Sequence, residues 1–147
     1  MNQDTLSMHD FAHLDMNQCI NTLVYGTTVQ MIRNKKKNKN KKPGIFVFSL
    51  CENDFHSLQW FYKFKNKKNV EKIDLGMISS VSHFNSPSDE KKPMKYDKKL
   101  ILEIMYGRNQ KLALLFNDYH TKELFWCGLN HFMDKFHAEE VAMYSKY

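Results

Sequence analysis

Glycine, proline and cysteine are scarce in this sequence, with 5, 3 and 3 occurrences among 147 residues. The low content of glycine and proline argues against collagen-like and low-complexity disordered chains. Cys19, Cys51 and Cys127 are odd in number, widely spaced and without a C-x-x-C pair. This spacing suggests neither a disulfide framework nor a zinc site. We therefore expect a protein of the reducing cytoplasm that holds no metal.

The sequence also lacks any apolar run near the roughly 18 residues that a membrane-spanning helix needs. Its first residues do not show the basic and then apolar pattern of a secretory signal. Residue 2 is Asn2, whereas N-myristoylation requires glycine, so an acyl anchor would have to lie outside this sequence. We expect a cytoplasmic protein that reaches membranes only peripherally.

Catalytic signatures are missing too. There is no Gly-x-Ser-x-Gly motif, no glycine-rich phosphate loop and no cysteine beside a recognisable histidine signature. His9 and His13 have a spacing that can bind a metal on a helix, but no third ligand accompanies them. Partly exposed histidines on an amphipathic helix are the more common situation. We expect a protein that is not an enzyme and that uses no cofactor.

What the sequence does contain is apolar and basic. Hydrophobic residues make up 42% and aromatic residues 14%, enough for the packed core of one domain. The formal net charge is +6 and the pI is about 9.1. Such a charge favours polyanionic partners, namely phospholipid headgroups, nucleic acid or acidic protein surfaces. Charge alone does not choose among them.

The periodicity of the apolar residues predicts mostly strands. A helical spacing covers residues 6–23 and ends at Gly26. Alternating or continuous apolar runs predict seven strands, at residues 29–32, 45–50, 57–64, 70–75, 77–84, 100–106 and 111–116. Prolines, serines and charges predict a loop at residues 85–99.

The last part of the chain changes to a helical period. Asn117 and Asp118 are suitable helix caps. A broad apolar face follows, formed by Phe125, Trp126, Leu129, Phe132 or Met133, and Phe136. The whole pattern predicts a mainly β fold, a bent seven-stranded antiparallel barrel or sandwich capped by a C-terminal α-helix, with an additional N-terminal helix.

This order resembles a pleckstrin-homology (PH) domain. The resemblance covers about residues 24–136 and rests on Gly26 before the first strand, a charged first hairpin loop, and Trp126 with Gly128 and Leu129 in the last helix. It implies an N-terminal helical extension at residues 1–23, a PH domain at 24–137 and a helical tail at 138–147. The Lys/Asn-biased loop and the extra helix are similar to the acylated PH-domain proteins (APH) of apicomplexan parasites. That similarity implies recognition of phosphatidic acid on secretory organelles, in docking or exocytosis.

The candidate lipid-binding residues are cations of two hairpin loops. They are Arg33, Lys35, Lys36, Lys37, Lys39, Lys41 and Lys42 in the first loop, with Lys63 and Lys65 in the third hairpin. In PH domains that grip phosphoinositides the second strand also carries cations, but residues 43–48 contain none. A looser grip on simple anionic headgroups follows. Lysine and asparagine also fill exposed loops without any function, which is the alternative for this segment.

Cations alone give weak membrane binding. Each lysine or arginine near an anionic surface contributes about 1 kcal/mol, so half of the first loop supplies about 3–4 kcal/mol, or roughly millimolar affinity. A headgroup contact, an apolar side chain or an acyl chain must supply the rest. The alternatives are a protein-interaction module of the same fold and a phosphoinositide-binding PH domain. Nucleic acid is not expected as a partner, because strand alternation places the aromatic residues around Trp60 mostly in the core. A monomer is expected.

Overall fold

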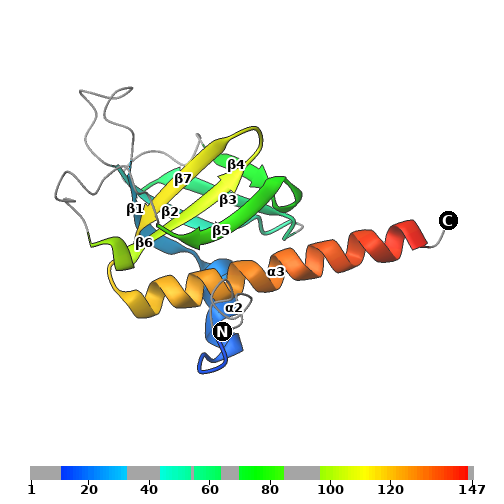
Figure 1. Cartoon of the computed structure of the whole chain (residues 1–147), viewed down its shortest axis with the longest axis horizontal. Helices are drawn as coiled ribbons and strands as arrows, with labels where there is room; N and C mark the ends of the chain where they lie inside the picture. Colours follow the sequence, from blue (N-terminus) through cyan, green and yellow to red (C-terminus); the bar gives the residue numbers. More distant parts are fainter. Residues whose placement is uncertain (1–10, 33–43, 54, 64–69, 85–96, 146–147) are drawn as a thin grey trace, which may run out of the picture.

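The computed structural model describes residues 11–32, 44–53, 55–63, 70–84 and 97–145, in which strands form a sheet beside a long C-terminal helix (Figure 1). The helices and strands are α2 (Met16–Tyr25), β1 (Thr27–Ile32), β2 (Gly44–Leu50), β3 (Ser57–Tyr62), β4 (Glu71–Asp74), β5 (Ile78–His83), β6 (Ile101–Tyr106), β7 (Gln110–Leu115) and α3 (Tyr119–Ser145). Two 3₁₀ helices, η1 (Leu75–Met77) and η3 (Lys98–Leu100), precede β5 and β6. The seven predicted strands and the C-terminal helix are confirmed.

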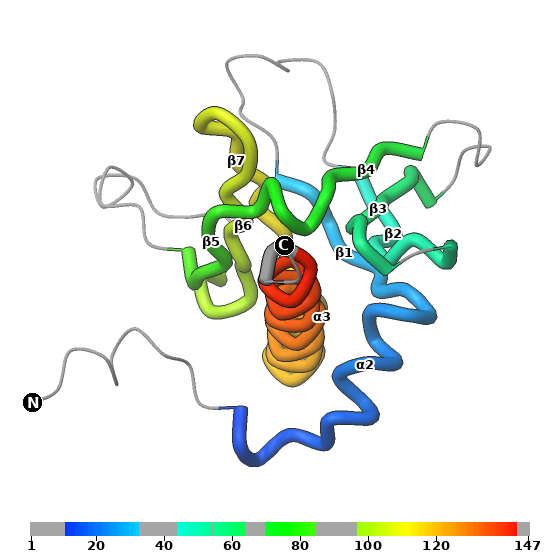
Figure 2. Tube along the Cα trace, turned by 90° about the vertical axis from the view of Figure 1, so that its right-hand side faces the viewer, coloured from blue at the N-terminus to red at the C-terminus, as the bar shows by residue number. Residues whose placement is uncertain are grey.

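All strands belong to one antiparallel sheet. Its order is β4-β3-β2-β1-β7-β6-β5, and β4 and β5 do not pair with each other, so the sheet is not closed. The sheet curls around α3, which Figure 2 shows nearly end-on. The predicted mainly β fold with a capping helix and an N-terminal helix is confirmed.

Strand register defines one end of the sheet, called here the open end. It is fixed by three cross-strand pairs: Met31 with Gly44, Phe46 with Tyr62, and Ile32 with Ala113. The open end is therefore formed by the end of β1, the start of β2, the end of β3 and the β6–β7 turn at residues 107–109. The end of β5, the start of β6 and the first turn of α3 lie at the other end.

Helix α3 packs its apolar stripe into the curl of the sheet. Asp118 caps it by accepting a hydrogen bond from the backbone N–H of Thr121 at 2.7 Å. Phe125 and Leu129 are completely buried, and Trp126 is only 6% exposed. The helix then extends beyond its packed part, since residues 137–143 are all exposed.

Of the helix predicted at residues 6–23, the described part contains α2, which begins only at Met16, and residues 6–10 lie outside that part. Asp15 caps it by accepting the N–H of Asn17 at 2.9 Å, and residues 11–15 precede it without helical structure. Cys19 and Leu23 of α2 are fully buried in contact with α3. The helices approach so closely at Gly128 that any Cβ there would collide with the carbonyl oxygen of Cys19. Burial and the neighbouring Cys127 thiol raise the pKa of Cys19 to about 12, so this cysteine is an unreactive core residue.

Candidate functional site

The lipid-binding cations predicted from the sequence belong to two hairpins whose flanking strands, β1 and β2, and β3 and β4, meet at the open end. Most of those residues lie outside the described part of the chain: Arg33, Lys35, Lys36, Lys37, Lys39, Lys41, Lys42 and Lys65. Their chain neighbours Ile32 and Gly44 lie at this end. Lys63 is the one predicted site residue that the structure describes, and it also lies here.

Lys63 is held in place by the sheet. Its backbone N–H donates to the carbonyl oxygen of Ile45 at 2.9 Å, which extends the β2–β3 pairing by one position. Lys63 is exposed, and Ile45 directly follows Gly44. The β3 cation therefore lies beside the point where the chain returns from residues 33–43.

Aromatic rings form a rigid base at the same place. The rings of Phe46 and Tyr62 meet edge to face with centroids 5.5 Å apart. A Cβ on Gly44 would come within 2.6 Å of the Phe46 ring and 3.1 Å of the Tyr62 ring. Glycine is therefore required where β2 begins, because both rings cover its backbone.

The β6–β7 turn adds a cation that the sequence did not identify. Gly107 and Asn109 have positive φ angles of 58° and 59°, and the Gly107 N–H donates to the Met77 carbonyl at 3.0 Å. This tight turn leaves Arg108 exposed at the open end. Residues 107–110 were recognised as a hairpin linker, but only the strand order shows that they lie near β1.

One nearby lysine already has an anionic partner. Lys111 lies 3.2 Å from Glu103 across the β6–β7 pair. The Glu103 side chain is 11% exposed, so this carboxylate holds Lys111 on the sheet. Strand β2 contributes no cation, and its alternate residues Phe46, Phe48 and Leu50 are in the core. The described part of the open end thus contains no convergent pocket for an inositol phosphate.

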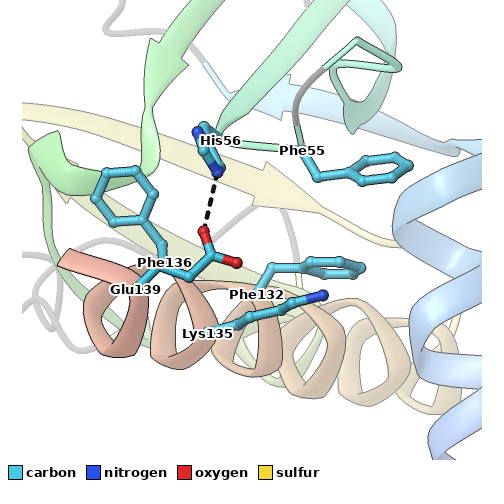
Figure 3. Close-up of a pocket in the computed structure, with 6 residues that line it drawn as sticks. All are labelled: Phe55, His56, Phe132, Lys135, Phe136 and Glu139. Carbon is cyan, nitrogen blue, oxygen red and sulfur yellow. Dashed lines mark hydrogen bonds and ion pairs between the residues drawn. The ribbon is translucent and has the colours of Figure 1, made fainter. Parts of the chain in front are cut away.

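A small pocket of about 50 Å³ lies elsewhere, between α3 and the β2–β3 turn (Figure 3). It is lined by Phe55, His56, Phe132, Lys135, Phe136 and Glu139. His56 Nε2 lies 3.2 Å from Glu139 Oε2, and Phe55, with a positive φ of 56°, packs its ring 6.0 Å from that of Phe132. Ligand pockets usually measure about 300–1,000 Å³. This one has room for a single side chain.

Lys122, at the opposite end of the sheet, is a buried cation that the sequence did not reveal. It has no exposed surface, and its Nζ donates to the Lys99 carbonyl at 2.8 Å and lies 2.9 Å from His83 Nδ1. Burial lowers its pKa to about 8, although the Glu123 and Asp97 carboxylates act in the opposite direction. Lys122 links α3 to η3 and β5. It cannot reach a headgroup at the open end.

The described residues contain no group of three or more metal-ligating side chains. His13 of the predicted histidine pair lies 3.5 Å from Glu123, and His9 is outside the described part. Within the same described ranges, no helix is both long and apolar enough to cross a membrane.

The fold is similar to solved PH-like structures. Inner Membrane Complex Sub-compartment Protein 1 (ISP1) from Toxoplasma gondii aligns with a TM-score of 0.61 and 16% identity, over 88% of this chain and 98% of that one. The PH domain from PfAPH aligns with a TM-score of 0.55 and 17% identity, over 80% and 87%. The PH domain from TgAPH gives 0.54 and 16%, over 80% and 88%.

No family model matches this sequence, and no curated protein does. The shared feature is therefore the PH-like fold, which the resemblance predicted and which is confirmed.

Proposed function

Because the chain has a PH-like fold, we propose that it is a non-catalytic, membrane-binding domain that recognises anionic phospholipid headgroups at the open end. The observation that carries the proposal is the position of Lys63 and Arg108. Both are exposed at the end of the sheet where residues 33–43 leave β1 and enter β2. Loops from separate hairpins can therefore contribute cations to one surface.

The proposed headgroup-binding residues are the predicted cations together with Arg108. They are Arg33, Lys35, Lys36, Lys37, Lys39, Lys41, Lys42, Lys63, Lys65 and Arg108. If half of them engage a membrane, at about 1 kcal/mol each, the sum of about 5 kcal/mol corresponds to an affinity near 0.2 mM. This affinity is too weak for stable attachment, so another contact must add to it.

Phosphatidic acid is the favoured headgroup. Its phosphomonoester is small, carries more than one negative charge and accepts several hydrogen bonds from lysines. A phosphoinositide grip is less well supported, because β2 provides no cation beside the loop base. We propose action at the surface of secretory organelles, in docking or exocytosis, with the protein held peripherally as a monomer.

Vesicle co-sedimentation tests the proposal. The protein is incubated with vesicles that contain phosphatidylcholine and one anionic lipid: phosphatidic acid, phosphatidylserine or a phosphoinositide. The three kinds of vesicle have equal total charge. We expect binding to all anionic vesicles and the most binding to phosphatidic acid. Equal binding to all of them would remove the headgroup preference, and absence of binding would reject the function.

Charge-reversal variants locate the surface. Replacing Lys35, Lys36 and Lys37 by glutamate should abolish binding with little change in melting temperature, because exposed charges contribute little to stability. The matched control reverses Lys98, Lys99 and Lys135, which are exposed away from the open end. The control has the same net charge, so equal loss in both variants would indicate attraction without a defined surface.

A protein-interaction module is the second candidate function. The α3 surface beyond the sheet favours it, since Val141 and Met143 are 67% and 68% exposed there. The pocket around Phe136 lies next to this part of the helix (Figure 3). Binding through these apolar side chains would survive high salt, whereas attraction by cations would weaken.

A further inference from the structure

One face of the sheet formed by β2, β3 and β4 points away from α3, and we call it the outer face. Phe46, Phe48 and Trp60 are buried on the inner face, so the alternate residues of these strands point outward. Gln59 donates to the Ser49 hydroxyl at 3.4 Å on this outer face, as expected for a directly opposed pair. Figure 2 shows α3 on the other side of these strands.

Apolar side chains gather on the outer face next to the open end. Val47 is opposite Phe61 in the β2–β3 register, and both are half-buried. Val70 directly precedes β4, and continuation of the β3–β4 register places it beside Phe61. Ile45 lies one step nearer the open end, and Ile45 and Val70 are 37% and 41% exposed. These four residues, Ile45, Val47, Phe61 and Val70, form what we call the outer apolar patch.

Lysines flank the outer apolar patch. Lys63 is opposite Ile45 on the side of the open end, and Lys72 is opposite Gln59 on the other side. Both lysines are exposed. The patch thus lies between cations that share its face.

Carboxylates of β4 do not disturb this arrangement. Glu71 faces the inner side of the sheet. The pKa of Tyr106 is raised mainly by the burial of that tyrosine and, to a smaller extent, by the negative charge of Glu71. Asp74 shares the outer face with Lys72, but it is opposite Ser57 at the end of β4 that is farther from the patch, and it accepts the Gly76 N–H at 2.9 Å. Among the described residues of β2, β3 and β4, no acidic side chain faces outward beside the patch.

This combination fits an anionic lipid surface. Apolar side chains can enter the bilayer interface while neighbouring lysines extend to the phosphates. An acidic protein surface would satisfy the lysines but would leave the apolar residues against charged groups. The patch is also continuous with the open end, because Lys63 borders both.

We propose that the outer apolar patch, with Lys63 and Lys72, is a second membrane-contact area that inserts Ile45 and Val70 into the interface of an anionic bilayer. This inference rests on the proposed function. The patch would supply the additional membrane contact that is required because the loop cations alone bind too weakly for stable attachment. Membrane attachment would then combine a salt-sensitive part from the loops with a salt-resistant part from the patch.

The test compares two double variants of the full chain on vesicles of phosphatidylcholine and phosphatidic acid. The Ile45→Ser/Val70→Ser variant should lower the partition coefficient about tenfold and remove the binding that remains at high salt. The Val141→Ser/Met143→Ser control removes apolar side chains that are more exposed and lie on α3, and it should bind like the unaltered chain. Far-ultraviolet circular dichroism checks that both variants are folded.

The outcomes separate this proposal from the proposed function. If the unaltered chain binds and the Ile45→Ser/Val70→Ser variant binds equally well, the second contact area is wrong and the headgroup function remains. If the unaltered chain does not bind, both fail. An equal loss in the control variant would also overturn the assignment to this patch.

A spectroscopic readout tests insertion directly. Val70→Cys can be labelled with an environment-sensitive fluorophore, because Cys19, Cys51 and Cys127 are all buried. Insertion predicts a blue-shifted and brighter emission on anionic vesicles, and the same label at Val141→Cys should not respond. An unchanged emission at residue 70 on vesicles that bind the protein would overturn the proposal.

Discussion

At the scale of single residues, Lys122 connects parts of the chain that are distant in sequence. Its Nζ reaches the Lys99 carbonyl and His83 Nδ1, and it lies 6.0 Å from the centre of the Trp126 ring. His83 also meets Trp126 edge to face at 4.5 Å. The tryptophan that indicated the fold therefore packs against a polar link between β5, η3 and α3.

Because of Lys122, we expect the free energy of unfolding to change with pH in the alkaline range. Its pKa in the folded protein is about 8, below the ordinary value of 10.5, so between these values the unfolded chain binds more protons. The contribution of Lys122 to the free energy of unfolding therefore rises with pH in this window. The raised pKa of Cys19 acts in the opposite direction, but it does so equally in a Lys122 variant. We expect a gain of about 2 kcal/mol between pH 8 and 10 relative to Lys122→Met.

Urea denaturation of both proteins across this range measures the effect. The comparison stops at pH 10, because burial also raises the pKa values of Tyr106 and Tyr119, and their ionisation in the unfolded chain lowers stability above that pH. A Lys122→Met variant with the same pH profile as the unaltered protein would show that the buried amine does not titrate as described.

At the scale of elements, the crossing of α2 and α3 depends on Gly128. Helix propensity alone predicts that Gly128→Ala stabilises α3 by about 1 kcal/mol. The contact with the Cys19 backbone predicts the opposite sign, because a methyl group must push α2 away. We expect a net destabilisation of about 1–3 kcal/mol.

Thermal denaturation of Gly128→Ala distinguishes the two effects by sign. Leu23 is also within reach of the added methyl group and is fully buried, so side-chain adjustment alone cannot make room. A raised melting temperature would mean that α2 does not pack against α3 at this point in solution.

The elements themselves were largely predictable. Apolar alternation predicted the strands. Asp118 predicted the start of α3, and Gly107 predicted the β6–β7 turn. Helix α2 was expected over residues 6–23 but spans Met16–Tyr25 in the described part. The spacing of Phe11 and Leu14 suggested that they belong to this helix. In the structure Asp15 is the N-cap of α2, so both residues precede the helix, and Phe11 packs on Trp126.

At the scale of the whole molecule, the net charge of +6 and the patch should give membrane binding two phases. Raising the ionic strength from about 0.1 M to 1 M shortens the Debye length from about 10 Å to 3 Å. Vesicle binding should fall steeply over the first part of such a titration and then reach a plateau set by apolar contacts. Binding unaffected by salt would exclude the loop cations as the main contact.

The sequence by itself determined the fold class, the positive charge and the concentration of that charge between the first two strands, because these depend on local periodicity and composition. Only the tertiary structure decided which cations share a surface. Arg108 joins the open end through the β1–β7 pairing, and Lys72 and Val70 flank Phe61 through the β3–β4 register. No sequence pattern distinguished Lys122 from the other lysines, and only the fold shows that it is buried. Register and strand order arise from contacts between residues far apart in the chain, which no local pattern specifies.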